Sequence, residues 1–485
     1  MVVSTLTDIK KVAIIGAGPG GLASARFLKS SGFEPVLIDS HTGIGGQWDH
    51  QNKNSGVWPE MRTNTFRDAT CLSDIPHSDE TSVFPKNGEI HQHLRDYADK
   101  FTLLENAYFS TKVTKLSRCS SGYELELAGP EGTHKETFPK VVIASGRYNK
   151  PRAMLIPGLD DFTGHLGVKH TFNYKSPEAY RDANVIVAGG SISALEIASD
   201  LTMLGAKSVA LAQRRQRYVM PKMVSGVPFE YFGFTYGAAV NPADEDEFAA
   251  EKLLEFALKY GGDPARYGAP APNADITKAG FTGSAHYLNL VAEERLKPRP
   301  WISKIEGDIV TFTNGDEAEA DAIILGTGFA LNLPFLSDEI SNTVGLTDQG
   351  MELSNFTFHP DLPGLAFVGL WAQNGGYFTP IEQQARYVSY VWSDTVECDD
   401  LDVGLQVCLT EQHHVGYREQ NEMALRFAKL SQTDPLGKID DDLTELVMQS
   451  ATTGLLFRLV GPQPIEDAQD RLYRQFARFG PQKNC

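Results

Sequence analysis

The chain has 485 residues, of which 41% are hydrophobic and 22% charged. A chain of this length is too long to fold around one hydrophobic core, so we expect two or three domains. Lys plus Arg number 44 against 62 for Asp plus Glu, giving a formal net charge of −18. Such a charge repels phosphate backbones and anionic membrane surfaces, so neither nucleic acid nor a membrane surface is expected as a partner.

The first predicted unit, residues 11–39, has the strand–loop–helix–strand pattern of a dinucleotide-binding site. After the strand KVAII, the loop GAGPGG places Gly16, Gly18 and Gly21 in GxGxxG spacing, and a helical pattern follows. The first glycine permits a tight turn, the second lets a pyrophosphate approach the backbone, and the third lets helix and strand pack closely. A second strand ends in Asp39, which is placed to bind a ribose diol.

The pattern recurs at residues 184–217 with a weaker loop. The strand NVIVAGG leads to Gly189, Ser191 and Ala194 at the three glycine positions, with Ser193 between the last two, and the helix SISALEIASDLTMLG follows. Serine is the smallest replacement that still permits close backbone approach. Taken alone, this loop matches the motif poorly.

Arginines stand where the first unit carries its acid. Arg214 and Arg215 end the second strand of this repeat, and Arg217 lies nearby. A ribose 2′-phosphate needs such cations, whereas a carboxylate would repel it; the alternative is a solvated basic cluster. Opposite charges at the two ribose positions predict FAD in the first unit and NADPH in the second.

Between Tyr218 and Pro298 the second domain carries extra sequence, which we call the insertion. In residues 240–285, the stretch DEDEFAAEKLLEFALKYGG predicts an amphipathic helix with early acids and a terminal glycine. Such a helix covers the substrate entrance or decorates the surface, and the second interpretation is favoured.

Two apolar strands, at 141–146 and 322–328, flank the second unit and end in small residues such as Gly328. This placement is typical of crossovers between two nucleotide-binding domains. We expect an α/β fold with two Rossmann-like domains: a discontinuous FAD domain of residues 1–150 and 321–400, an inserted NADPH domain of residues 151–320, and a helical C-terminal region of residues 401–485.

A late segment, LAFVGLWAQNGGYFTPIEQQARYVSYV, reads as a strand, a glycine-bearing loop and a helix opened by Thr379 and Pro380. The N–H groups at the start of this helix could face the flavin C2 carbonyl and stabilise negative charge on reduced flavin. Proline at a helix start is equally common without a ligand. Trp371 and Gln373 precede the helix and are candidates to line a substrate pocket.

Over nearly its whole length the chain resembles the flavin-containing monooxygenases, FAD- and NADPH-dependent enzymes that oxygenate amines and sulfides. Besides the two nucleotide loops, the resemblance rests on GGQW at 45–48, RTNTFRDATCLSDIP at 62–76, GTGF at 326–329, EQQAR at 382–386 and FRLVGP at 457–462. It implies that the cofactors are also held by Gly46, Gln47, Trp48, Gly328, Thr379 and Gln384.

The resemblance further implies a catalytic role for Asn64. In the family, one oxygen atom enters an amine nitrogen or sulfide sulfur through a C4a-(hydro)peroxyflavin, which an asparagine at this position and NADP⁺ protect. A neutral amide can donate to a peroxide and accept from it without acting as a nucleophile. The alternative is that Asn64 only turns its loop, a common role for Asn in a stretch such as TNT.

The family fingerprint FxGxxxHxxx(Y/F) is only partly met. Five residues separate Gly164 from His170, where three are usual, and Tyr174 follows at the expected spacing, so the role of His170 is open. The same resemblance leaves Baeyer–Villiger oxidation of a ketone as an alternative. Arg62 stands near the position of an arginine that such enzymes use, but Tyr174 stands where they typically carry Trp.

Two more remote alternatives are a flavin-dependent NADPH oxidase or reductase and a nucleotide-binding regulator. The five cysteines are scattered without a CxxC pair, so neither a disulfide reductase nor a metal site is indicated. No stretch approaches the roughly 20 apolar residues of a membrane span, and the N-terminus lacks a signal peptide core. We expect a cytoplasmic enzyme that acts on a small-molecule substrate and O₂. By analogy, we expect it to form a homodimer.

Overall fold

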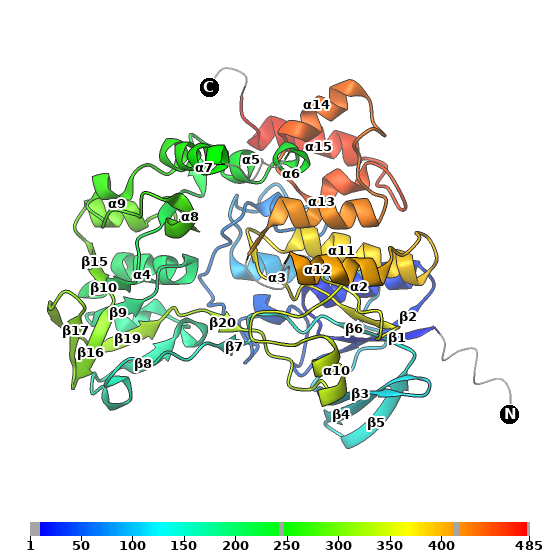
Figure 1. Cartoon of the computed structure of the whole chain (residues 1–485), viewed down its shortest axis with the longest axis horizontal. Helices are drawn as coiled ribbons and strands as arrows, with labels where there is room; N and C mark the ends of the chain where they lie inside the picture. The colour runs from blue at the N-terminus through cyan, green and yellow to red at the C-terminus, as the bar shows by residue number, and fades with distance from the viewer. Residues whose placement is uncertain (1–9, 242–246, 412–416, 483–485) are drawn as a thin grey trace.

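A computed structural model of the chain describes residues 10–241, 247–411 and 417–482. Two parallel sheets form its centre, and each lies between a layer of helices and a small antiparallel sheet (Figure 1). This arrangement is the α/β fold with two Rossmann-like domains that the sequence predicts.

The first sheet consists, in order, of β2 (Glu34–Ile38), β1 (Lys11–Ile15), β6 (Lys140–Ile143) and β21 (Leu365–Phe367). Val12 and Ile14 pack toward helices on one face, and Ala13 and Ile15 pack toward an antiparallel sheet on the other. This double burial explains the continuous apolar run of β1. The covering elements are α2 (Pro19–Ser30), α3 (Asn87–Lys100) and α11 (Phe378–Trp392) on one face, and β3 (Lys112–Cys119), β4 (Gly122–Gly129), β5 (Gly132–Phe138) and α10 (Asp338–Thr343) on the other.

The second sheet repeats this plan with β15 (Leu296–Pro300), β10 (Ser208–Gln213), β9 (Asn184–Ala188), β19 (Ala322–Leu325) and β8 (Gly167–His170), in that order. Val185 and Val187 of β9 face the helices, whereas Ile186 and Ala188 face the antiparallel sheet. The covering elements are α4 (Ile192–Leu204) and α9 (Tyr287–Ala292) on one face and β16 (Ile302–Glu306), β17 (Ile309–Phe312) and β18 (Glu317–Glu319) on the other.

The chain crosses between the two sheets twice, and the two crossing segments pair with each other. β7 (Lys150–Pro151) is antiparallel to β20 (Phe329–Ala330). Because β19 pairs with β8 and β9, it belongs to the second sheet, although the expected boundary after residue 320 assigns it to the first domain. The sequence predicts an apolar strand at these residues, but only the pairing of that strand with its neighbours shows to which sheet it belongs.

The insertion and the C-terminal region pack against each other, as Figure 1 shows for the α5–α7 side of the molecule. The insertion contains β11 (Tyr218–Met220), β12 (Met223–Val224), β13 (Val227–Pro228), α5 (Glu230–Gly233), α6 (Tyr236–Val240), α7 (Glu247–Tyr260), α8 (Ile276–Ala279) and β14 (Phe281–Gly283). The C-terminal region is helical as expected, with α12 (Leu401–Thr410), α13 (Gln420–Leu430), α14 (Asp441–Gln449) and α15 (Ala468–Phe479), and β23 (Arg418–Glu419) pairs with β22 (Gln373–Asn374).

Among the helices that the structure describes, none combines the length and the apolar character required to cross a bilayer.

Candidate functional site

A cavity of about 2430 Å³ collects residues from both parallel sheets, the insertion and the C-terminal region. Pockets for one drug-sized ligand measure roughly 300–1,000 Å³, so this cavity has room for two dinucleotides and a substrate. Most of the expected site residues line it: Gly16, Gly18, Asp39, Gly46, Gln47, Trp48, Arg62, Asn64, Gly189, Ser191, Ser193, Arg214, Arg215, Gly328 and Gln373.

The first glycine loop has the close contacts that its motif predicts. Gly16 has φ +109°, and a Cβ there would lie 2.5 Å from the Ala144 carbonyl oxygen. A Cβ on Gly21 would lie 1.9 Å from the Gly16 carbonyl oxygen. Gly18 precedes α2 as its N-cap residue and has no side chain to cap it, so N–H groups of the first turn are left for an anion. The loop therefore fits a pyrophosphate.

Replacement of Gly21 by Ala is expected to remove FAD from the protein, because the new methyl group pushes α2 away from the loop. Overpacking of this kind costs roughly 1–3 kcal/mol of stability. Gly20→Ala is the matched control, since its Cβ would meet Val368 at an ordinary 3.5 Å. The measurement is the ratio of flavin to protein after purification; equal flavin content in the two variants would contradict the expected packing.

Asp39 directly follows β2 and lines the cavity. Its Oδ2 accepts a hydrogen bond of 2.7 Å from the Ala17 N–H, and its Oδ1 accepts one of 2.8 Å from the His41 N–H. Burial raises the pKa of the Asp39 carboxyl above its ordinary value, and these two N–H groups oppose the rise. The backbone thus fixes the carboxylate, whose remaining lone pairs are free for a ligand.

The GGQW segment packs directly on the glycine loop. A Cβ on Gly46 would lie 2.9 Å from the Gly18 Cα, and Gly46 has φ +56°, so this approach requires glycine at position 46. Gln47 donates from Nε2 to the Tyr148 carbonyl at 3.0 Å and accepts at Oε1 from the Gly56 N–H at 2.8 Å. Gln47 therefore lines the cavity, and its two hydrogen bonds connect the wall segments at Gly56 and Tyr148.

Helix α11 begins one residue before the predicted Thr379 and Pro380. Tyr377 precedes it without a side-chain cap, and both Tyr377 and Phe378 line the cavity. Trp48 meets Phe378 edge to face, with the ring centroids 6.0 Å apart. The uncapped N–H groups at the start of α11 fit a flavin carbonyl that gains negative charge.

Four expected site residues do not line the cavity: Gly21, Trp371, Thr379 and Gln384. The buried Gln384 amide accepts from the Gly369 N–H at 2.9 Å and donates to the Phe367 carbonyl at 2.9 Å, so it holds the loop after β21. Trp371 donates from Nε1 to Gln373 Oε1 at 2.8 Å. The hydroxyl of the buried Thr379 has no partner among the described residues. Gln384 and Trp371 thus act on the cavity through Gly369 and Gln373, which line it.

The second loop is closed by the GTGF segment. A Cβ on Gly189 would lie 2.4 Å from the Gly326 carbonyl oxygen, and one on Gly326 would lie 2.8 Å from the Ala194 Cβ. Ser191 begins α4 without a side-chain hydrogen bond to the helix, which leaves its N–H groups for a phosphate. Despite its poor motif match, the loop therefore has the geometry of the first one.

The three arginines of this domain line the cavity together beyond the end of β10. The Arg214 guanidinium lies over the Trp301 ring, 5.6 Å from its centroid. Arg215 donates to the Lys278 carbonyl, and Arg217 donates to the Phe281 carbonyl at 3.2 Å. Arg214 and Arg215 are exposed, so both can turn to a ribose 2′-phosphate.

Asn64 is exposed to the cavity, and its amide makes no hydrogen bond with the described residues. The turn around it is held by Thr63 instead, whose N–H donates to the Pro85 carbonyl at 2.9 Å and whose hydroxyl donates to the Thr65 carbonyl at 2.7 Å. The loop-turning role is therefore filled by its neighbours, and the Asn64 amide is left for a ligand. Arg62 lines the cavity, but its guanidinium also donates to the Phe84 carbonyl at 3.1 Å.

His170 and Tyr174 lie in the packing of the second domain. The His170 ring accepts at Nδ1 from the Phe172 N–H at 3.1 Å and meets the Phe329 ring edge to face at 5.1 Å. Tyr174 is fully buried and meets the Trp58 ring at 5.2 Å. Neither lines the cavity, but their ring partners Phe329 and Trp58 do, so His170 and Tyr174 support the cavity wall from behind.

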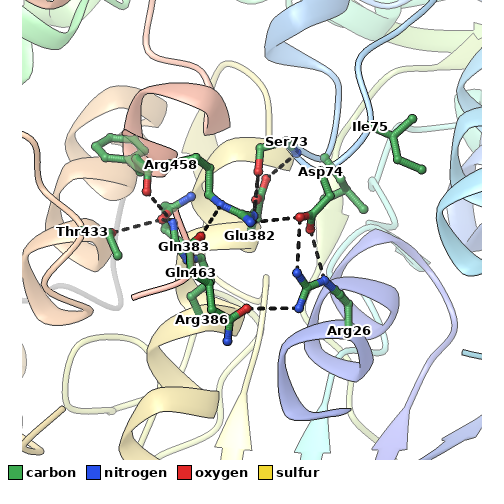
Figure 2. Close-up of polar contacts among 12 residues, drawn as sticks. Arg26, Ser73, Asp74, Ile75, Glu382, Gln383, Arg386, Thr433, Arg458 and Gln463 are labelled. Carbon is green, nitrogen blue, oxygen red and sulfur yellow. Dashed lines mark hydrogen bonds and ion pairs between the residues drawn. The ribbon is translucent and has the colours of Figure 1, made fainter. Parts of the chain in front are cut away.

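Three motifs of the resemblance, SDIP, EQQAR and FRLVGP, meet in a buried ionic network outside the cavity (Figure 2). Arg458 forms ion pairs with Asp74 at 2.9 Å and with Glu382 at 3.4 Å. Arg386 donates to the Phe457 carbonyl at 2.6 Å and to the Pro462 carbonyl at 2.8 Å. The network fastens the C-terminal region to the first domain.

Several cavity residues were not predicted from the sequence. Leu253 and Phe256 of α7 line the cavity, so the interpretation of this helix as surface decoration was wrong. Its polar face resembles any exposed helix, and only the fold shows what the apolar face covers. Lys222 and the buried Glu230 also line the cavity, and no motif marks either residue. Within the described ranges, no group of three or more His, Cys, Asp or Glu residues could hold a metal ion.

A family described as "Flavin-binding monooxygenase-like" matches residues 9–463, and both glycine loops, the GGQW segment and Asn64 fall inside that match. The chain belongs to this family. It is therefore a flavin-dependent monooxygenase that uses FAD and NADPH.

Curated relatives extend over almost the full chain. "Flavin-containing monooxygenase 1" of Homo sapiens is 25% identical over 506 residues, covering 97% of this chain and 92% of the relative. "Dimethylaniline monooxygenase [N-oxide-forming] 2" of Rattus norvegicus is also 25% identical, with the same two coverages.

Two solved structures share the fold. S-allyl-L-cysteine S-oxygenase from Allium sativum has a TM-score of 0.65 at 21% identity and covers 97% of this chain and 98% of its own. Open cyclohexanone monooxygenase has a TM-score of 0.64 at 16% identity and covers 87% of this chain and 97% of its own. At these identities the likeness shows the architecture alone.

Proposed function

We propose that this enzyme transfers one oxygen atom from O₂ to the nitrogen of an amine or the sulfur of a sulfide. The observation that carries the proposal is Asn64, which lines the cavity and whose amide has no hydrogen-bond partner among the described residues. A free amide can donate a hydrogen bond to an activated oxygen and leaves that oxygen electrophilic toward a soft nucleophile.

FAD, when bound, supplies the transfer of electrons from NADPH and the activation of O₂. The protein binds its pyrophosphate at Gly18 and the start of α2, and its ribose at Asp39. The start of α11 stabilises negative charge on the flavin ring, and Arg214 with Arg215 holds the 2′-phosphate of NADPH. Leu253 and Phe256 of α7 add apolar side chains to the cavity wall, and an apolar wall favours oxygen transfer over release of hydrogen peroxide.

Baeyer–Villiger oxidation of a ketone is the second candidate, because Arg62 lines the same cavity as Asn64. The Arg62 guanidinium is engaged by the Phe84 carbonyl and the Ser82 hydroxyl, at 3.1 and 3.2 Å, which favours a structural role. Tyr174 is buried outside the cavity, so it favours neither reaction.

A substrate panel tests the proposal. FAD-loaded enzyme is supplied with NADPH, O₂ and separate sulfides, tertiary amines and cyclic ketones, and products are analysed by mass spectrometry. Sulfoxides or N-oxides are expected, with little or no lactone. Turnover of ketones alone would reject the proposal in favour of the second candidate.

Replacement of both Arg214 and Arg215 by Gln is expected to raise the KM for NADPH by roughly 10- to 100-fold. This equals the loss of about one charge-assisted hydrogen bond of 1.5–3 kcal/mol, because both arginines are exposed and solvent screens their charges. The KM for NADH, which lacks the 2′-phosphate, should hardly change. Arg295→Gln removes an exposed arginine paired with Glu293 and serves as the control. Equal losses for NADH and NADPH would contradict the assignment.

The homodimer and the cytoplasmic location stay predictions from the sequence. Size-exclusion chromatography with light scattering tests the first, and fractionation of the source cells tests the second.

A further inference from the structure

Two side chains of the insertion hold the backbone on either side of Asn64. Lys222 donates from Nζ to the Thr63 carbonyl at 3.3 Å, on the N-terminal side. Glu230 accepts at Oε1 from the Phe66 N–H at 3.1 Å, on the C-terminal side. Because no described residue contacts the Asn64 amide through a hydrogen bond, the backbone of residues 63–66 sets where this amide points.

Lys222 connects this loop to the second nucleotide-binding domain. Its Nζ lies 2.9 Å from Glu196 Oε2, and the two side chains are only 11% and 18% exposed, so solvent screens the ion pair less than at the surface. Glu196 also accepts from the Ser284 hydroxyl at 3.0 Å. It stands on α4, whose first residues form the second phosphate loop. One helix and one ion pair therefore join the NADPH site to the Asn64 loop.

Glu230 anchors the other side of the loop from α5. It is 2% exposed, and burial raises the pKa of its carboxyl to about 7. Its second oxygen, Oε2, has no partner among the described residues, so the Phe66 N–H is the contact that this carboxyl makes with the loop. The chain after α5 is fixed in turn, because the Thr452 N–H donates to the Phe234 carbonyl at 2.9 Å.

We propose that Lys222 and Glu230 are positioning residues that hold Asn64 toward the flavin and make its position depend on the occupied NADPH site. The inference rests on the proposed function of Asn64. Displacement of a reacting geometry by about 1 Å can cost 10²-fold in rate, so a loop held at both sides is what oxygen transfer requires. Loss of either contact should let activated oxygen leave as hydrogen peroxide, while flavin reduction by NADPH continues.

Matched pairs of variants separate positioning from folding. Lys222→Met removes the donor and the charge, whereas Lys222→Arg keeps both. Glu230→Met removes the acceptor, whereas Glu230→Gln keeps an acceptor oxygen for the Phe66 N–H. Glu196→Gln leaves Lys222 in place and weakens only its link to α4. Thermal unfolding of each FAD-loaded variant establishes that it is folded at the assay temperature.

The first readout is the yield of oxygenated product for each NADPH oxidised. We expect this yield to fall at least about fivefold in Lys222→Met and Glu230→Met, with NADPH oxidation near that of the wild type, and to recover in Lys222→Arg and Glu230→Gln. The second readout is hydrogen exchange of the peptide that covers residues 62–67. NADP⁺ should slow this exchange in the wild type and lose that effect in Lys222→Met and Glu196→Gln.

Unchanged exchange and unchanged product yield in folded Lys222→Met and Glu230→Met would overturn the inference. Should either Met variant unfold, Glu196→Gln decides the link to α4: an NADP⁺ effect equal to that of the wild type would overturn it. If the wild type makes no oxygenated product, the proposed function fails, but the exchange measurement still tests the two contacts.

Discussion

Replacement of Asn64 by Ala is expected to lower oxygenated product formation by roughly 100-fold while NADPH oxidation continues, with hydrogen peroxide as the product. The magnitude is that of removing one hydrogen-bond donor from developing negative charge in an enclosed site. Asn64→Asp keeps the size of the side chain, replaces its donor by an acceptor, and should show a similar loss. The measurements are NADPH consumed, peroxide released and product formed by the same FAD-loaded sample.

A second cavity asparagine provides the control for this experiment. Asn54 lines the same cavity, and the one hydrogen bond that its amide makes with the described residues is a long one of 3.5 Å to the Ser40 hydroxyl. Asn54→Ala should therefore keep the wild-type ratio of product to NADPH. A wild-type ratio in Asn64→Ala would show that the amide does not act on oxygen, and the site would need another donor.

Replacement of Arg458 by Met is expected to lower the free energy of unfolding by about 3–5 kcal/mol, because it removes the cation paired with the buried Glu382 and one of the two paired with Asp74. The Glu382 side chain is 0% exposed and that of Asp74 is 7% exposed. Chemical denaturation of the FAD-loaded enzyme measures the change. Arg478→Met is the control, since its ion pair with Asp79 is exposed and should contribute at most about 1 kcal/mol.

The loss in Arg458→Met should depend on pH. Burial by itself would raise the pKa of Asp74, but the Arg458 and Arg26 guanidiniums hold it below its ordinary value. A carboxyl with a lowered folded pKa stabilises the protein above its unfolded pKa of about 4, and this contribution disappears as the pH falls through the folded pKa. The difference between wild type and Arg458→Met should therefore be full near neutral pH and shrink below about pH 4. A loss no larger than that of Arg478→Met would show that the network does not stabilise the fold.

The geometry of the two glycine loops was predictable because each loop depends on residues close together in the sequence. Gly16, Gly18 and Gly21 occupy one turn, and Asp39 follows at the end of the next strand. The arginines after β10 indicate the second site although its loop matches poorly. Spacing of this kind encodes backbone geometry directly.

Contacts between distant segments were not predictable in the same way. Lys222 and Glu230 bind backbone atoms 159 and 164 residues away, and a carbonyl or an N–H carries no sequence signal. Arg458 likewise pairs with Asp74, 384 residues away in the sequence. The FRLVGP motif could therefore be recognised from the sequence, but the ion pairs of its arginine could not. The place of β19 depends on pairing with β8 and β9, which an apolar run cannot specify.

Transfer of one atom of O₂ to the substrate is the central claim, and isotopic labelling tests it most directly. FAD-loaded enzyme is given NADPH, an organic sulfide and ¹⁸O-labelled dioxygen, and the mass of the product is measured by mass spectrometry. We expect a sulfoxide that carries one labelled oxygen, with one NADPH oxidised for each sulfoxide formed. An unlabelled sulfoxide, or oxidation of NADPH with all of the oxygen recovered as hydrogen peroxide, would contradict the claim.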